Sequence, residues 1–111
     1  METNNAITAL SALAQEHRLT AFRLLVRAGE DGMAAGELAR SLAIPHNTMS
    51  SHLAVLSHAG LITSRREGRS IIYFIAPDAM RELLGFLADD CCQGRPELCG
   101  LTIQDKPTAC C

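Results

Sequence analysis

The sequence predicts a mainly α-helical domain that carries one small β-hairpin. Apolar residues recur at helical spacing up to Gly60 and again between residues 77 and 90. Between these regions, two runs rich in β-branched residues flank a short glycine-containing segment, which is the pattern of a hairpin. With 111 residues, of which 48% are hydrophobic, the chain is long enough for one compact domain.

The first two predicted helices cover residues 5–14 and 16–28. Both have apolar residues three and four positions apart, which is typical of a helix with one apolar face. The glycines of residues 29–32 end the second helix and form a loop. The apolar faces are Ile7, Leu10 and Ala14 in the first helix, and Leu19, Phe22, Leu25 and Val26 in the second.

A third predicted helix covers residues 35–42, and a short turn leads to a fourth helix from about Pro45 to Ala59. Gly60 ends it. The fourth helix contains no Asp, Glu, Lys or Arg, although solvent-facing helix surfaces usually carry them. Such a surface suits close approach to a polyanion, and the alternative is an exposed helix that is merely rich in Ser and Ala. Its apolar stripe is Met49, Leu53 and Leu56, and the opposite face is Asn47, Ser51, Ala54 and His58.

The hairpin is predicted from residues 61–66 and 70–75, with residues 67–69 at its tip and three arginines clustered there. A fifth helix then runs from Pro77 to about Asp90, because Pro and Asp are favourable in a first helical turn. We expect its apolar stripe to pack on a partner subunit. That stripe is Met80, Leu83, Leu84 and Leu87.

The third and fourth predicted helices are joined by a tight turn, and the second helix of this pair is uncharged. A hairpin with an arginine-rich tip follows them. This order of elements predicts a helix-turn-helix with a basic wing. The start of the second helix is expected to read base edges in the major groove, and the wing to contact the DNA backbone or minor groove. The net charge is −2, but residues 32–75 carry +2 and residues 76–111 carry −3, which is also compatible with ordinary surface variation. The candidate DNA-binding residues are His46, Asn47, Thr48, Ser50, Ser51, Arg65, Arg66 and Arg69.

The sequence from Gly36 to Ile62, followed by Arg65-Arg66-Glu67-Gly68-Arg69 and Tyr73, resembles the ArsR/SmtB family of winged-helix repressors, as does the upstream segment of residues 17–25. The resemblance covers about residues 6–90. It implies a homodimer with the first and last helices at the interface. It also implies that the apo dimer binds double-stranded operator DNA and releases it when an inducer binds.

All five cysteines lie beyond residue 90, so we divide the chain into a DNA-binding and dimerisation domain, residues 1–90, and a cysteine-rich sensing tail, residues 91–111. One arsenic site of the family uses cysteines in the third helix, and this chain has none there. A zinc site of the family uses Asp and His of the terminal helices, and the fifth helix has no histidine. The remaining candidates are Cys91, Cys92 and Cys99, with Cys110 and Cys111 as a second pair.

Three thiolates without a fourth nitrogen or sulfur ligand suit a trigonal, thiophilic ion such as As(III) or Sb(III) better than tetrahedral zinc. A vicinal pair with a third cysteine nearby is similar to the arsenite-responsive repressors of this family. The second pair, Cys110 and Cys111, is an extra trap, a relay or an unstructured end, and we favour the last. The sequence therefore predicts a repressor that releases DNA on binding As(III) or Sb(III).

Two other functions stay open. A thiol-redox or persulfide-sensing repressor would use the same cysteines, although Asp89 and Asp90 directly precede the first pair and disfavour a reactive thiolate. The second open function is that of a protein that binds metal through its thiolates and does not regulate DNA. We expect no enzymatic activity, no cofactor needed for folding and a cytoplasmic location without membrane contact, because the polar start lacks a signal-peptide pattern and no long apolar run occurs.

Overall fold

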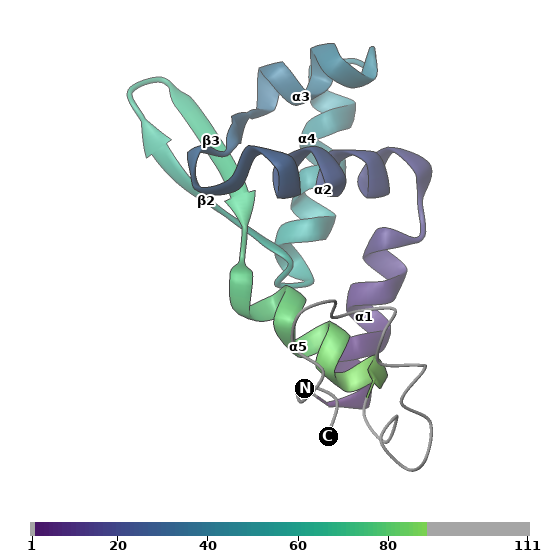
Figure 1. The fold of residues 1–111 in the computed structure, drawn as a ribbon. Helices are drawn as coiled ribbons and strands as arrows, with labels where there is room; N and C mark the ends of the chain where they lie inside the picture. The colour runs from purple at the N-terminus through teal and green to yellow at the C-terminus, as the bar shows by residue number, and fades with distance from the viewer. Residues whose placement is uncertain (1, 89–111) are drawn as a thin grey trace.

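The computed structural model describes residues 2–88 as a helical body from which a β-hairpin projects (Figure 1). The mainly helical fold class is confirmed, and each predicted helix and strand is present within these residues. A 3₁₀ turn and a third strand were not predicted. The elements are α1 (Thr3–Leu13), α2 (Glu16–Ala28), the 3₁₀ turn η1 (Gly29–Asp31), β1 (Met33–Ala34), α3 (Ala35–Leu42), α4 (His46–His58), β2 (Ile62–Glu67), β3 (Ser70–Ile75) and α5 (Pro77–Ala88).

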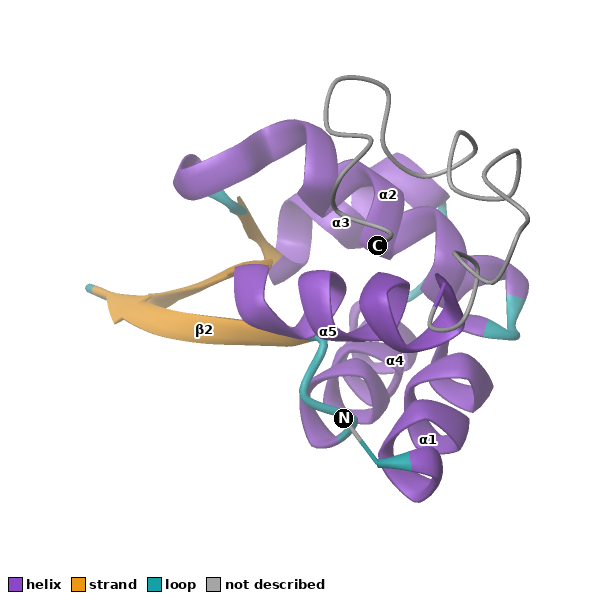
Figure 2. Ribbon diagram, turned by 60° about the horizontal axis from the view of Figure 1, so that its bottom comes forward, coloured by secondary structure: helices purple, strands orange, loops and turns teal. Residues whose placement is uncertain are grey.

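The three strands form one antiparallel sheet in the order β1-β3-β2. In the hairpin, Arg66 pairs with Ile71 and Glu67 with Ser70, and Gly68 takes a φ of 64° in the turn. Strand β1 consists of two residues that pair with Ile72 and Tyr73 of β3. The hairpin leaves the body as a wing, which Figure 2 shows from a second direction.

Gly32 makes the pairing of β1 possible. Its φ is 66°, and a Cβ atom there would lie 2.3 Å from the carbonyl oxygen of Tyr73. Only glycine accepts both this backbone conformation and this close approach. The strand joins the wing to the segment between α2 and α3, so the wing is fixed to the helical body at its base.

Helices α2 and α3 begin and end where the sequence predicts, whereas α1 begins two residues earlier than predicted. Helix α2 starts after Gln15, whose side-chain oxygen accepts a hydrogen bond from the Arg18 backbone N–H at 2.9 Å, and it ends at Gly29. Helix α3 starts where the Glu37 carboxylate accepts a bond from the Ala34 N–H at 3.0 Å. These local bonds satisfy backbone groups that a helix end leaves unpaired.

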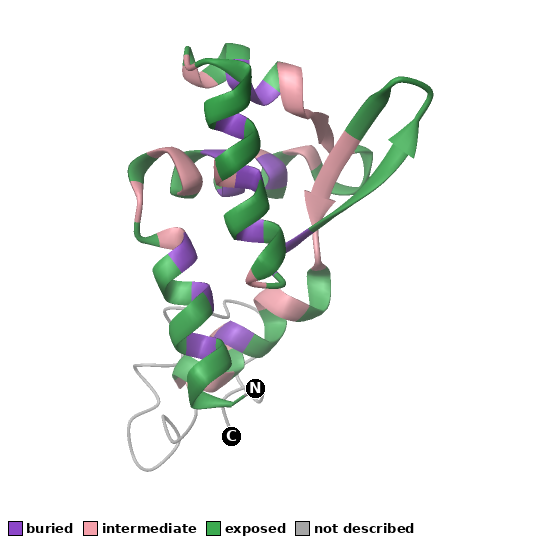
Figure 3. Cartoon of the chain, turned by 180° about the vertical axis from the view of Figure 1, so that it is seen from behind, coloured by how far each residue is buried: buried purple, intermediate pink, exposed green. Residues whose placement is uncertain are grey.

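The core lies between α1, α2, α3 and α4 and the base of the wing, and α5 adds one buried residue, Leu83. Figure 3 shows the buried residues in purple. The apolar stripe predicted for α4 is confirmed, because all three of its members are fully buried. Of the three inward positions predicted for α3, Leu38 and Ala39 are buried and Leu42 is half-buried. The largest fully buried side chains are Leu25, Leu38, Met49, Leu53, Leu56 and Leu61.

The apolar face predicted for the first helix, formed by Ile7, Leu10 and Ala14, points away from the rest of the chain. Ile7 is 55% exposed, Leu10 is 41% exposed and Ala14 is exposed. The buried face of α1 consists of small residues, which let the helix pack closely on the rest of the domain. Those residues are Ala6, Ala9 and Ala12.

The stripes of α2 and α5 are confirmed in part. In α2, Phe22 and Leu25 are buried, whereas Leu19 and Val26 are exposed. In α5, only one of the four predicted apolar residues is buried, namely Leu83, and Leu87 is 54% exposed. Helices α1 and α5 contact each other, so the residues that expose large apolar side chains on them belong to adjacent helices.

Candidate nucleic-acid interface

Helices α3 and α4 are joined by a turn of three residues, Ala43, Ile44 and Pro45. Ala43 takes the left-handed conformation, with a φ of 57°, and its N–H bonds back to the carbonyls of Ala39 and Arg40. Pro45 is extended and precedes the first residue of α4. This compact turn fixes the angle between the two helices, as a helix-turn-helix requires.

The first turns of α4 present a polar, uncharged surface. The five residues predicted there are all exposed, and none of them carries a carboxylate. The Asn47 side-chain oxygen accepts a bond from the Thr48 N–H at 3.0 Å, and the Ser51 hydroxyl donates to the Asn47 carbonyl at 3.3 Å. A surface of this kind can enter a groove of DNA without charge repulsion. The five residues are His46, Asn47, Thr48, Ser50 and Ser51.

The structure separates the three wing arginines, which the sequence predicted to cluster at the tip. Arg66 and Arg69 are exposed and form no ion pair with any residue from 2 to 88. Arg65 points to the other face of the hairpin, because successive residues of a strand alternate between faces. The two-residue period of a strand by itself predicts this difference between Arg65 and Arg66.

The side chain of Arg65 contacts other residues of the same chain. Its guanidinium pairs with the Glu67 carboxylate, donates to the carbonyls of Glu30 and Asp31 at 3.4 Å each, and lies 5.1 Å from the centre of the Phe74 ring. These contacts connect the wing to η1 at the end of α2. A DNA contact by Arg65 stays a prediction, and it would have to compete with these partners.

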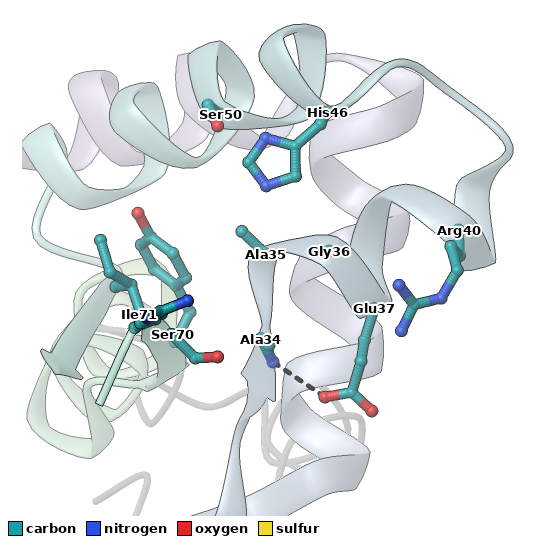
Figure 4. Close-up of a pocket in the computed structure, with 11 residues that line it drawn as sticks. Ala34, Ala35, Gly36, Glu37, Arg40, His46, Ser50, Ser70 and Ile71 are labelled. Atoms are coloured by element: carbon teal, nitrogen blue, oxygen red, sulfur yellow. Dashed lines mark hydrogen bonds between the residues drawn. The ribbon is translucent and has the colours of Figure 1, made fainter. Parts of the chain in front are cut away.

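A cleft of about 400 Å³ lies between the start of α3, the start of α4 and strand β3 (Figure 4). Its lining includes Arg40 and Tyr73, neither of which the sequence predicted as a site residue. The Arg40 Nη1 atom lies 3.5 Å from the position that a Cβ atom would take at Gly36. The spacing of four residues from a glycine could have indicated that this arginine folds back along α3. The cleft is lined by Ala34, Ala35, Gly36, Glu37, Arg40, His46, Ser50, Arg69, Ser70, Ile71 and Tyr73.

His52 connects α4 to the junction of α1 and α2. Its Nδ1 lies 3.5 Å from Nη1 of Arg18, and its ring centre lies 5.5 Å from that of His17. Arg18 is itself anchored, since its Nε donates to the Ala12 carbonyl at 2.6 Å. Burial, followed by the positive charges of Arg18 and His17, lowers the pKa of His52 below its usual value. These surroundings favour the neutral form of the His52 ring.

The five predicted metal ligands, Cys91, Cys92, Cys99, Cys110 and Cys111, lie outside the described residues. Between residues 2 and 88, no group of three or more His, Cys, Asp or Glu residues is placed to hold a metal ion. No helix in the same part of the chain is long and apolar enough to cross a membrane.

Comparison with known proteins identifies transcriptional regulators. A family profile described as a helix-turn-helix domain matches residues 13–65. The chain is 30% identical over 95 residues to the transcriptional activator HlyU of Vibrio cholerae, covering 84% of this chain and 85% of HlyU. It is 35% identical over 80 residues to the nodulation protein NolR of Rhizobium meliloti, covering 72% of this chain but only 63% of NolR.

Solved structures give the same fold. The winged helix-turn-helix domain Mb0332 of Mycobacterium bovis, described as homodimeric, DNA-binding and a possible ArsR-family regulator, is 29% identical with a TM-score of 0.65 and covers 73% of each chain. Reduced HlyU is 31% identical with a TM-score of 0.62, covering 77% of this chain and 90% of HlyU. A possible transcriptional regulator for arsenical resistance is 26% identical with a TM-score of 0.65, covering 86% of this chain and 96% of that one. The chain belongs to the ArsR family of winged helix-turn-helix transcriptional regulators.

Proposed function

We propose that this protein is a homodimeric repressor that binds operator DNA and releases it on binding As(III) or Sb(III). The observation that carries the DNA-binding part is the uncharged, exposed first half of α4 beside Arg66 and Arg69 of the wing. Helix α4 would enter the major groove with its N-terminal residues toward the base edges. The wing arginines would contact phosphates or the minor groove.

The proposed dimer forms through α1 and α5. Ile7, Leu10 and Leu87 expose large apolar surfaces on these two adjacent helices. The relative Mb0332 is described as homodimeric. A two-fold symmetric dimer would place two copies of α4 in successive major grooves, so the operator would be palindromic.

The proposed inducer site consists of Cys91, Cys92 and Cys99, which follow α5 in the sequence. Thiolates select soft, thiophilic ions, and a bound cation favours the deprotonated thiols that hold it. Closure of the three sulfurs around one ion would reorganise the chain directly after α5, beside the proposed dimer surface. The spacing of the two α4 helices would then no longer match the operator. One related structure is described as a possible regulator for arsenical resistance, which supports this choice of inducer.

Thiol oxidation is a second candidate input for the same cysteines. A relative of this chain, HlyU, has been solved in a form described as reduced. Against this candidate, Asp89 and Asp90 precede Cys91 in the sequence and disfavour its thiolate. Oxidation and metalloid binding differ in one respect that is easy to measure: a reductant that carries no thiol, such as a phosphine, reverses the first and leaves the second.

The test measures fluorescence anisotropy of the chain's own upstream DNA with the full chain under reducing conditions. We expect salt-dependent binding, release by arsenite, and no release by arsenite from the Cys92→Ser variant. A matched control, Cys110→Ser with Cys111→Ser, should still release. Release by peroxide but not by arsenite would assign the redox input instead. A reporter gene under the same promoter should rise when the protein is deleted, whereas a fall would show an activator, as HlyU is described.

A further inference from the structure

Arg18 is a half-buried arginine that forms no ion pair with any residue from 2 to 88. Removing a charged group from water is costly unless hydrogen bonds use its donors. The backbone of Arg18 is fixed at the start of α2, because its N–H donates to the Gln15 side chain at 2.9 Å. The side chain belongs neither to the proposed DNA surface nor to the proposed cysteine site.

The guanidinium of Arg18 joins two helices other than its own. Its Nε atom donates to the Ala12 carbonyl in the last turn of α1 at 2.6 Å, and its Nη1 atom lies 3.5 Å from Nδ1 of His52 on α4. Carbonyls in the last turn of a helix carry a partial negative charge, which suits a cation. A neutral imidazole with its proton on Nε2 can accept at Nδ1, and the lowered pKa of His52 favours the neutral ring. We call these three groups the Arg18 bridge.

The other contacts between α1 and α4 give little control over the angle between the two helices. The buried residues of α1 are alanines, and within residues 2–88 no hydrogen bond runs directly from α1 to α4. A groove of about 580 Å³ lies between the two helices, lined by Ala12, Arg18 and Ala54 among others. Apolar contacts are non-directional, whereas charge-assisted hydrogen bonds have a preferred length and direction. The Arg18 bridge therefore restricts how α4 can turn relative to α1.

The two ends of the Arg18 bridge lie at the two surfaces that the proposed function uses. His52 directly follows Ser51 and lies one helical turn after Thr48, and both of these are candidate base-reading residues. At the other end, α1 carries Ile7 and Leu10 of the proposed dimer surface. A two-fold dimer reads a palindrome when the distance between its two recognition helices matches the distance between the half-sites. The bridge lies on the path that sets this distance in each protomer.

We propose that the Arg18 bridge determines which spacing between operator half-sites the dimer accepts. The proposal rests on the proposed function, since it needs a dimer formed through α1 that binds palindromic DNA. Arg18 does not touch DNA in this proposal but positions α4 through His52. Loss of the bridge would leave the reading of one half-site unchanged and relax the requirement for a fixed distance between two half-sites.

The test compares the affinity of the full chain for three duplexes. These are the operator found by footprinting the upstream DNA, the same operator with one base pair inserted between its half-sites, and a single half-site. The ratio of the first two affinities is the spacing preference. Arg18→Lys keeps the positive charge, but one ammonium group cannot reproduce the two separate donors of the guanidinium. We expect the spacing preference to fall by about 2- to 30-fold in Arg18→Lys, with half-site affinity and salt dependence unchanged.

Three other variants control for the chemistry of the change. Arg23→Lys makes the same substitution at an exposed position of α2 and should keep the wild-type preference. His52→Leu removes the acceptor and should lower the preference as Arg18→Lys does. His52→Asn restores an acceptor near the position of Nδ1 and should recover most of it.

The ratio separates positioning from a loss of stability, because both duplexes are titrated with the same sample and a lower folded fraction cancels. All titrations are made above the dimer dissociation constant of each variant, which sedimentation equilibrium provides. A wild-type spacing preference in dimeric Arg18→Lys, or an equal fall in Arg23→Lys, would overturn the proposal and leave operator binding intact. A wild-type chain that binds the single half-site as tightly as the operator would overturn the proposed dimeric repressor and, with it, this proposal.

Discussion

Replacing Leu10 by alanine tests whether the outward face of α1 is a dimer surface. Full burial of a leucine side chain contributes about 1.5–3 kcal/mol. Leu10 is 41% exposed, so burial of this exposed part by a partner subunit would contribute about 0.6–1.2 kcal/mol per protomer. A two-fold interface contains the residue twice, which gives about 1.2–2.4 kcal/mol for the dimer. The dimer dissociation constant should therefore rise by about 8- to 60-fold.

Sedimentation equilibrium over a concentration series measures this constant directly. Ile71→Ala is the matched control, because Ile71 is 39% exposed and lies on the wing, away from α1 and α5. We expect the control to dimerise as the wild-type chain does. Equal dissociation constants for wild type and Leu10→Ala would refute the assignment of this face to the dimer, as would an equal weakening by Ile71→Ala.

Three further predictions concern single residues. Arg66→Ala should weaken operator and random duplexes together and lower the salt slope by about 1.8 per dimer, and an unchanged slope would argue against a phosphate contact. Because burial, Arg18 and His17 lower the pKa of His52 in the folded state, its stabilising effect is complete above the unfolded value of about 6.5 and is lost as the pH falls through the folded pKa. Wild type should therefore lose more thermal stability than His52→Gln between pH 7.5 and 5.5, and parallel losses would contradict this. Gly32→Ala should lower the free energy of unfolding by about 1–2 kcal/mol or more in urea, since its φ is 66° and its Cβ would meet Tyr73, and an unchanged urea midpoint would contradict the role of Gly32 in holding β1.

The sequence predicted α3 and α4 well because local signals define them. Gly60 and Pro45 delimit α4, and the spacing of Met49, Leu53 and Leu56 matches the residues that are buried. The same reasoning found the apolar face of α1, which this chain itself leaves exposed. Periodicity identifies an apolar face but not whether the same chain or a second copy covers it. Alanines such as Ala9 score weakly as core residues, although here they allow close packing.

The candidate site was predicted in part. The exposed residues at the start of α4 follow from the helical period alone. The different role of Arg65 follows from the two-residue period of a strand, combined with a partner in η1 that only the folded chain brings near. The sequence could not show that Arg40 and Tyr73 line the same cleft, since the two residues are 33 positions apart and only the folded chain brings β3 beside α3. Strand β1, with two residues, is too short to show a period.

The coupling between inducer and DNA is the central claim, and thermodynamic linkage gives its most direct measurement. The affinity of the full chain for arsenite is measured by calorimetry, once free and once saturated with operator. The account predicts that operator weakens arsenite binding by the same factor by which arsenite weakens operator binding, typically about 5- to 150-fold. Equal arsenite affinities in the free and DNA-bound states would contradict the account.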